Sequence, residues 1–282
     1  MRRGVVGSRP HCASESLLEG MGRRLPLGWS DFLRQVAIWL GFVLAYQVAR
    51  GLADRDAEEA FRNADRIVEL EHRLGGLVEL DLQRLVLDAP GILLHAANWT
   101  YWLSQFAVVS AVLLWVYLER TAAYVSLRNT LIVVNTLGLV GYVAMPTAPP
   151  RMLPEHGFVD TLSGSEALNH GSGIVELASN QYAAMPSLHA ADALVVGVAL
   201  ALVVRRPALS VLCLLFPLWV WFSLLATANH FWLDVVAGIA LAALGAAIAL
   251  RPSHMHAGGT RNPESPSRPG PRAQGALSGS RR

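Results

Sequence analysis

Long apolar runs constrain this chain more than any other feature of its sequence, because about 18 or more mainly apolar residues suffice to cross a bilayer as a helix. Six runs have this character: 33–52, 92–118, 129–146, 187–204, 208–226 and 230–250. With 53% hydrophobic and 16% charged residues among 282, and a mean hydropathy of +0.37, the chain is too apolar for an ordinary soluble domain. The sequence therefore predicts an all-α bundle of six transmembrane helices.

Polar segments on either side of these runs divide the chain into three parts. A polar tail over 1–30 precedes a six-span domain over 31–250, and the remainder, 251–282, is rich in Pro, Gly, Ser and Arg. Such a tail cannot bury enough surface to fold, so we expect it to be disordered. Before the second span, 54–90 is charged but keeps apolar residues at helical spacing, which favours one or two amphipathic helices on the membrane surface, with a break at Gly75–Gly76.

Arginine positions orient the predicted bundle. Six spans place both termini on one side of the membrane, together with the loops 119–128 and 205–207. These loops contain Arg120, Arg128, Arg205 and Arg206. Because basic loops favour the cytoplasm, we expect a multi-pass protein of the cell membrane with both termini cytoplasmic. The long loop 147–185 and the starts of the fourth and sixth spans then face outward.

Two histidines lie at these outward ends. His189 begins the fourth predicted span, and His230 begins the sixth, with Asp234 four residues later on the same helical face. A hydrogen bond from the carboxylate to one ring nitrogen leaves the other nitrogen basic, as a nucleophile or general base requires. The pattern indicates a candidate active site on the outer side of the membrane.

The same segments are suited to binding an anion. Both histidines fall in the first turn of a predicted helix, where unpaired amides and the helix dipole favour a phosphate group. Ser187 follows Pro186 and is placed to cap the fourth span and to offer a donor to an oxyanion. Arg151, in the turn after the third span, can hold the same group through its guanidinium.

Three motifs carry a resemblance to a known family: PTAPPR at 146–151, MPSLHA at 185–190 and NHFWLD at 229–234. With them the chain resembles the type 2 phosphatidic acid phosphatase superfamily over roughly 30–250, and is most similar to its branch of inositol phosphorylceramide synthase-like enzymes, the inositol phosphotransferases. The resemblance implies that His230 attacks phosphorus to form a phosphohistidine and that Asp234 orients it. It also implies that His189 protonates the leaving oxygen.

Two positions differ from many relatives of that superfamily. An arginine is common six residues before the nucleophile, where this chain has Leu224, and a glycine is common before the middle histidine, where this chain has Leu188. Both differences are expected of the synthase-like branch. Without that arginine, Arg151 becomes the main expected phosphate ligand, with Ser187 beside it.

The chemistry of two histidines requires no metal or cofactor. The expected substrate is a phospholipid or a polyprenyl phosphate, and the acceptor decides the activity: water makes the protein a phosphatase, whereas an alcohol such as inositol makes it a phosphotransferase. No residue in the sequence selects between these acceptors. With a net charge of only +2, we expect no nucleic-acid partner.

Two other classes of function fit the same residues. His189, His230 and Asp234 are also metal or haem ligands by type, which would make the protein a metal-binding membrane protein. A non-catalytic lipid-binding or transport protein is the other alternative, because a bundle that retains these motifs can still bind a phospholipid without turning it over.

Overall fold

The computed structural model describes residues 25–52, 56–162 and 181–251. Most of the predicted N-terminal tail and almost all of the predicted C-terminal tail lie outside these residues. The first helix of the described residues, α2, spans Gly28–Leu52 and so begins three residues before the predicted domain boundary. Within the described ranges the chain is all α-helical, and its extended pairing consists of one isolated bridge between Thr147 and Ala183.

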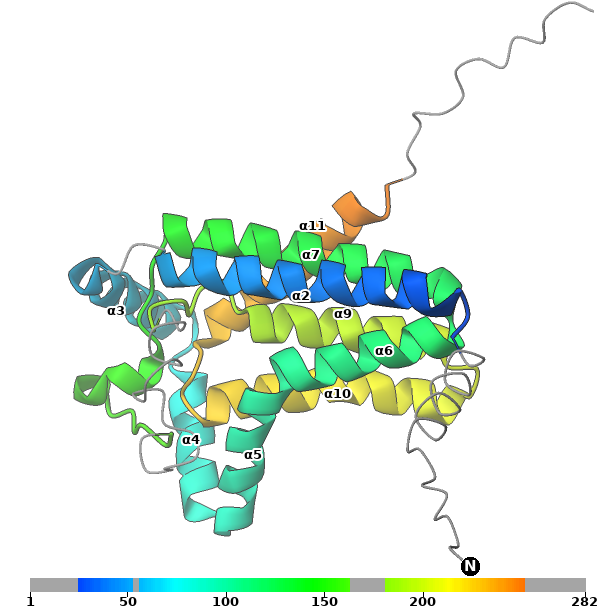
Figure 1. Ribbon diagram of the computed structural model, residues 1–282. Helices are drawn as coiled ribbons and strands as arrows, with labels where there is room; N and C mark the ends of the chain where they lie inside the picture. Colours follow the sequence, from blue (N-terminus) through cyan, green and yellow to red (C-terminus); the bar gives the residue numbers. More distant parts are fainter. Residues whose placement is uncertain (1–24, 53–55, 163–180, 252–282) are drawn as a thin grey trace, which may run out of the picture. The chain divides into compact units, whose positions relative to one another are not determined.

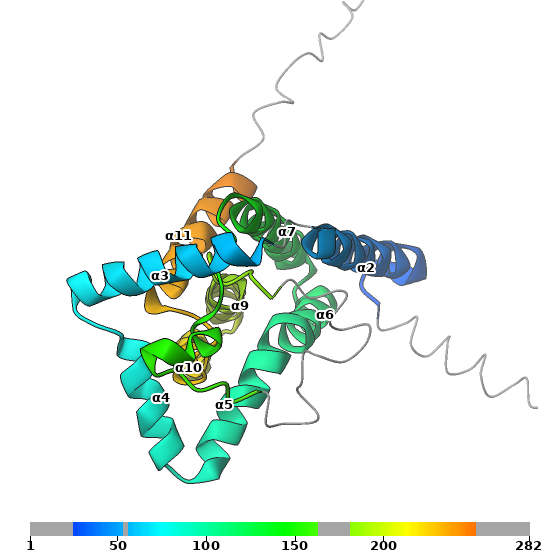
Figure 2. The same cartoon turned by 90° about the vertical axis from the view of Figure 1, so that its left-hand side faces the viewer.

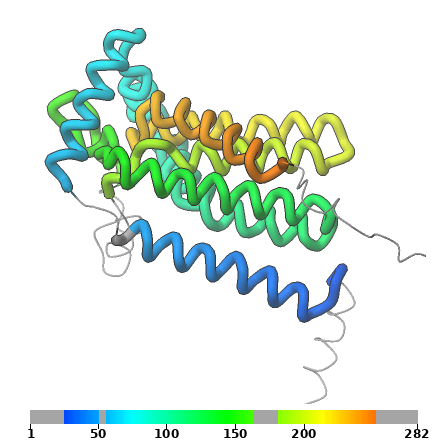
Figure 3. The backbone as a smooth tube through the Cα atoms, turned by 90° about the horizontal axis from the view of Figure 1, so that it is seen from above, coloured from blue at the N-terminus to red at the C-terminus, as the bar shows by residue number. Residues whose placement is uncertain are grey.

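The apolar runs form a bundle of helices that lie side by side (Figures 1 and 3). It consists of α2, α6, α7, α9, α10 and α11, whereas α5, which continues into α6 through η1, turns away from the bundle and lies beside α4, Val78–Asp88 (Figures 1 and 2). Their bounds are Gly91–Leu103 for α5, Ser104–Val108 for the π-helix η1, Val109–Glu119 for α6, Thr121–Ala144 for α7, Leu188–Val203 for α9, Pro207–Ala226 for α10 and Trp232–Ala249 for α11. α9 is the central helix, because it packs against α6, α7, α10 and α11.

Five of the six predicted spans are long and apolar enough to cross a membrane. The exception is the fourth predicted span, α9, which has 16 residues, or about 24 Å of helix, against a hydrocarbon core of about 30 Å. The prediction of a loop over 119–128 is wrong, because α7 already begins at Thr121. Tyr124 and Leu127 are buried in the core, so this turn is held in the helix by packing. The composition is that of an integral membrane protein.

The segment before the second span forms two helices, α3 over Ala57–Leu74 and α4 over Val78–Asp88. The break lies at the predicted Gly75–Gly76, where both residues have positive φ angles of 140° and 107°. In α3 the apolar residues Ala60, Ala64, Ile67 and Val68 are buried. α3 crosses one end of the bundle (Figure 2), where Ala148 donates to the carbonyl of Ala60. Its location on a membrane surface stays a prediction.

Small residues let the MPSLHA segment lie deep between α7 and α11. A Cβ on Gly141 of α7 would lie 2.5 Å from the ring of Pro186, and one on Gly138 would lie 2.5 Å from the side chain of Leu188. Leu188 itself is fully buried. These contacts fix the start of α9 and therefore the position of His189.

Candidate active site

His230 lies in a tight turn between α10 and α11, and backbone hydrogen bonds hold this turn in place. The amide of Asn229 donates to the carbonyl of Leu224 at 3.0 Å. Ala228 has a φ angle of +52°, an unusual value for a residue with a side chain. Its carbonyl accepts a hydrogen bond from the amide of Arg151 at 2.8 Å, so the turn is tied to the PTAPPR segment.

The imidazole of His230 is held through Nδ1. This nitrogen lies 3.0 Å from the carbonyl oxygen of Ala184 and 3.4 Å from Oδ2 of Asp234. A carbonyl oxygen can only accept a hydrogen bond, so Nδ1 must carry a proton, and in the neutral imidazole the lone pair is then on Nε2. The side chain of His230 is buried, and its surroundings therefore fix both the tautomer and the orientation of the ring.

Asp234 contacts His230 as the spacing predicts, but its closer partner is the backbone. Its Oδ2 accepts a hydrogen bond from the amide of Phe231 at 2.9 Å, which caps α11. The carbonyl of Ala184, which no side-chain motif reveals, is the nearer acceptor for the histidine.

One expectation about α11 is wrong in detail. His230 precedes the helix, whose N-cap is Phe231, and so does not lie in its first turn. The amides at the start of α11 are also partly occupied, since Leu233 donates to Oε1 of Glu71 at 2.9 Å and Phe231 donates to Asp234. Carboxylates therefore hold positions that an anion would otherwise take.

His189 faces His230 across a small cavity. It lies in the first turn of α9, and the centroids of the two imidazole rings are 5.8 Å apart. The ring of Tyr101 from α5 stacks on His189 with centroids 4.6 Å apart. The structure thus brings together the two histidines that the sequence predicts as nucleophile and acid.

Ser187 caps α9 as predicted, because its Oγ accepts a hydrogen bond from the amide of Ala190 at 3.3 Å. The side chain is fully buried and is not part of the cavity wall. Its predicted contact with a phosphate stays a prediction, and the role that the structure gives Ser187 is the cap of α9.

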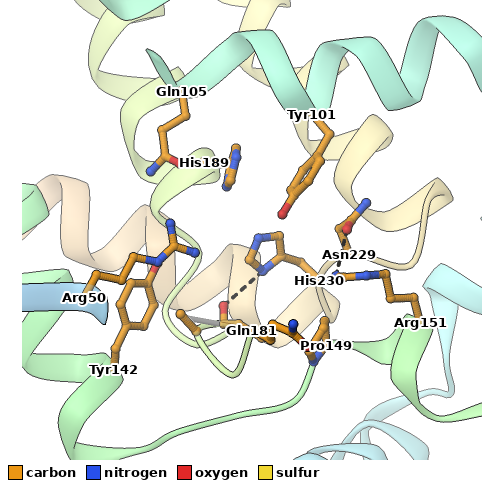
Figure 4. A pocket seen from close by; sticks show the side chains of 12 residues that line it. Arg50, Tyr101, Gln105, Tyr142, Pro149, Arg151, Gln181, His189, Asn229 and His230 are labelled. Atoms are coloured by element: carbon orange, nitrogen blue, oxygen red, sulfur yellow. Dashed lines mark hydrogen bonds between the residues drawn. The ribbon is translucent and has the colours of Figure 1, made fainter. Parts of the chain in front are cut away.

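Two arginines line the cavity on either side of His230 (Figure 4). The predicted Arg151 donates from Nη1 to Oδ1 of Asn229 at 2.9 Å, and its Nε lies 4.0 Å from Asp160. The other is Arg50, in the last turn of α2, whose guanidinium lies 5.9 Å from the ring centre of Tyr142. Sequence reasoning missed Arg50, for which the available signal was a charged residue inside the end of an apolar run.

The cavity also contains a polar side chain from within the bundle. The π-helix η1 carries Gln105, which lines the cavity and hydrogen-bonds to Asp192 of α9. Asn135 of α7 donates to the same carboxylate at 2.8 Å. The complete lining is made by Arg50, Tyr101, Gln105, Tyr142, Pro149, Arg151, Gln181, Ala183, Ala184, His189, Asn229 and His230.

The geometry does not favour the metal-site alternative. A metal site needs at least three His, Cys or acidic side chains whose ligand atoms lie close together. In the described ranges, the group of three with ligand atoms within 4.8 Å of one another is Asp65, Glu155 and His156. None of these three side chains lines the cavity, and the predicted set of His189, His230 and Asp234 does not form such a group.

A scan against protein families matches residues 65–248 to the PAP2 superfamily, the type 2 phosphatidic acid phosphatases. The chain belongs to this superfamily. Membership indicates a metal-independent membrane phosphatase or phosphotransferase that acts on lipid phosphates. No curated protein and no solved structure matches the chain. The match covers His189, His230 and Arg151 but begins after Arg50.

Proposed function

We propose that the protein transfers the phosphate of a lipid through a phosphohistidine formed on His230. The observation that carries this proposal is the hydrogen bond from Nδ1 to the carbonyl of Ala184, which leaves the lone pair on Nε2 in a cavity shared with His189. A neutral imidazole fixed in this way is ready to act as a nucleophile.

The proposed reaction has two steps. Nε2 of His230 attacks phosphorus while the bond from phosphorus to the lipid oxygen breaks, and His189 donates its proton to that oxygen. An acceptor hydroxyl then attacks the phosphohistidine, His189 takes the hydroxyl proton, and the N–P bond breaks to regenerate His230. Protons and charge balance over the two steps, and neither step needs a metal.

Arg50 and Arg151 are the proposed phosphate ligands. Leu224 is fully buried in an apolar cluster, so the position where many relatives have an arginine supplies no charge here. Arg50 offers a guanidinium from a different helix to the same cavity. Because it lies outside the matched residues, its role rests on the structure and not on the family. Ser187 acts in this scheme through its cap of α9.

The finer identity of the reaction follows the resemblance to the inositol phosphotransferase branch. Water as the acceptor gives a phosphatase, and inositol or another alcohol gives a transferase. The lipid donor is a phospholipid or a polyprenyl phosphate, approached from the outer side of the cell membrane with both termini in the cytoplasm.

The test is to trap a phosphoenzyme with labelled lipids. Purified protein in lipid vesicles is offered labelled phosphatidate, phosphoinositide or polyprenyl diphosphate, and then water, inositol or glycerol. We expect acid-labile label on the protein, turnover that survives EDTA and is inhibited by vanadate, and loss of both in His230→Ala. His95→Ala changes an exposed histidine and is the matched control. Full turnover by His230→Ala would contradict the mechanism, and lipid binding without turnover would favour the non-catalytic alternative.

A further inference from the structure

Two buried glutamates hold the first turn of α11 from outside the bundle. Glu71 lies near the end of α3 and Glu79 at the start of α4, on either side of the glycine break. Both side chains are 0% exposed. Oε1 of Glu71 accepts a hydrogen bond from the amide of Leu233 at 2.9 Å, an amide that has no partner within its own helix.

Among the described residues, the pair has no basic partner to neutralise it. The ionisable groups that bear on Glu71 from the elements packed against it are Glu79 from α4 and Asp234 from α11, and both are acids. Two buried carboxylates side by side repel each other and lose their hydration. One carboxyl of the pair must therefore keep a proton.

The remaining oxygens lead to the same conclusion. Within the described part of the chain, no donor lies in good hydrogen-bond geometry to Oε2 of Glu71 or to either oxygen of Glu79, although the amides of Glu79 and Trp232 bear on the Glu79 carboxyl and partly offset the effect of burial on its pKa. A proton retained by one carboxyl supplies the missing donor, because it forms a hydrogen bond to the other. Burial, followed by the effect of Glu79, raises the pKa of Glu71 to about 10, and burial raises the pKa of Glu79 as well.

We propose that Glu71 and Glu79 form a carboxyl pair that shares one proton and positions the first turn of α11, and with it His230. The inference rests on the function proposed above, because it assigns the pair to the placement of that nucleophile. The single negative charge of the pair at the start of α11 is favourable to the helix dipole. Neither glutamate lines the cavity, so both are positioning residues.

The surrounding helices explain how the pair reaches the nucleophile. α4 packs against α10, whereas Glu71 contacts α11, so the α3–α4 hairpin holds both helices that flank the turn containing His230. Phe231, between Leu233 and His230, is fully buried with Phe158, with ring centroids 6.4 Å apart. A shift in the first turn of α11 therefore moves the imidazole.

Substitutions separate positioning from simple packing. Glutamine at 71 can accept from Leu233 and donate to Glu79, so it reproduces the protonated acid, whereas alanine cannot. We expect Glu71→Ala to lower kcat by about 10- to 100-fold with KM nearly unchanged, and Glu71→Gln to stay within about threefold. Glu69 lies on the same helix with an exposed side chain, so Glu69→Ala and Glu69→Gln are the controls and should change neither constant.

The second readout is stability against pH, which requires no activity. The folded protein holds one proton that the unfolded chain releases near its ordinary pKa of 4.5, so the stabilising effect is complete below about pH 4.5 and is lost as the pH rises to about 10. Between pH 7 and 10, the ratio of folded to unfolded protein should therefore fall more steeply in the wild type than in Glu71→Gln. The expected difference is up to about tenfold per pH unit. Thermal unfolding in detergent measures this difference.

Each contrary outcome is distinct. Equal losses in Glu71→Gln and Glu71→Ala, wild-type kcat in Glu71→Ala, or identical pH dependence in wild type and Glu71→Gln would overturn the shared-proton pair. A wild-type melting temperature that rises with Ca²⁺ and falls with EDTA would also overturn it, because a cation would then neutralise the glutamates. Failure of the phosphohistidine proposal is seen separately, as turnover retained by His230→Ala, and leaves the pH measurement unaffected.

Discussion

The amide of Ser187 donates a hydrogen bond to the carbonyl of Asp234 at 3.0 Å, so the residue that caps α9 is bonded directly to the first turn of α11. One turn further along α11, Gly238 lies against the same serine, and a Cβ there would be 2.3 Å from the Ser187 carbonyl oxygen. The two helices meet backbone to backbone at this point. The contact sets the distance between His189 and His230.

Gly238→Ala should therefore impair the site from outside the cavity. The added methyl group meets backbone atoms that cannot rotate away, and overpacking of this kind costs about 1–3 kcal/mol of stability. We expect a lower melting temperature in detergent and at least about tenfold lower turnover, because the histidines separate. Gly41→Ala in α2 is the control, since a Cβ there has no neighbour within 4 Å. Wild-type turnover in Gly238→Ala would show that this contact does not set the site.

The sequence identifies the side chains whose roles depend on local spacing. His230 and Asp234 are one helical turn apart, and the PSLH motif places Ser187 as a cap before His189, so both units can be recognised without a fold. Arg50 could not be assigned in this way. It enters the cavity only because α2 packs beside α7, about 90 residues later in the chain.

The burial of Glu71 and Glu79 could not be predicted from the sequence for a related reason. Glu69 and Glu71 lie two residues apart in a charged segment and have the same side chain, yet one is exposed and the other is fully buried. The contact with Leu233, 162 residues away, decides the difference. A pattern of charges predicts a helix but not which of its carboxylates another element covers.

Arg50 should contribute to substrate binding to a similar extent as Arg151. A hydrogen bond to a charged group contributes about 1.5–3 kcal/mol, so we expect Arg50→Ala to lower kcat/KM by about 10- to 150-fold. Arg50→Lys should recover only part of this loss, because an ammonium lacks the planar fork of donors. Initial rates with a lipid phosphate measure both variants.

The matched control for Arg50 is Arg34→Ala, which removes an exposed arginine from the same helix. If Arg50→Ala and Arg34→Ala have the same kcat/KM as the wild type, Arg50 does not hold the phosphate. If the two variants lose activity equally, the loss reflects the overall charge of α2 and not the cavity.

Asp234 has two roles that different substitutions should separate. Asp234→Asn keeps an oxygen that can accept from Phe231 but removes the charge near His230, so we expect about 10- to 100-fold lower kcat with little change in stability. Asp234→Ala should also lose about 1 kcal/mol through the missing cap. Because Nδ1 of His230 has the Ala184 carbonyl as its nearer acceptor, Asp234→Asn should retain more activity than His230→Ala. Equal rates in these two variants would contradict that order.

The strained turn before the nucleophile gives the last prediction. Ala228 is fully buried at a φ of +52°, a conformation that costs about 1–2 kcal/mol for a residue with a Cβ. Ala228→Gly removes this strain but also a buried methyl group worth about 0.8 kcal/mol, so its stability and turnover should stay close to wild type. Ala228→Val adds a β-branched side chain where neither the backbone nor the packing accepts it. It should displace the carbonyl that holds the amide of Arg151, and therefore lower both the melting temperature and kcat/KM. A valine variant as active as the glycine variant would show that this turn tolerates movement and that His230 is positioned mainly through α11.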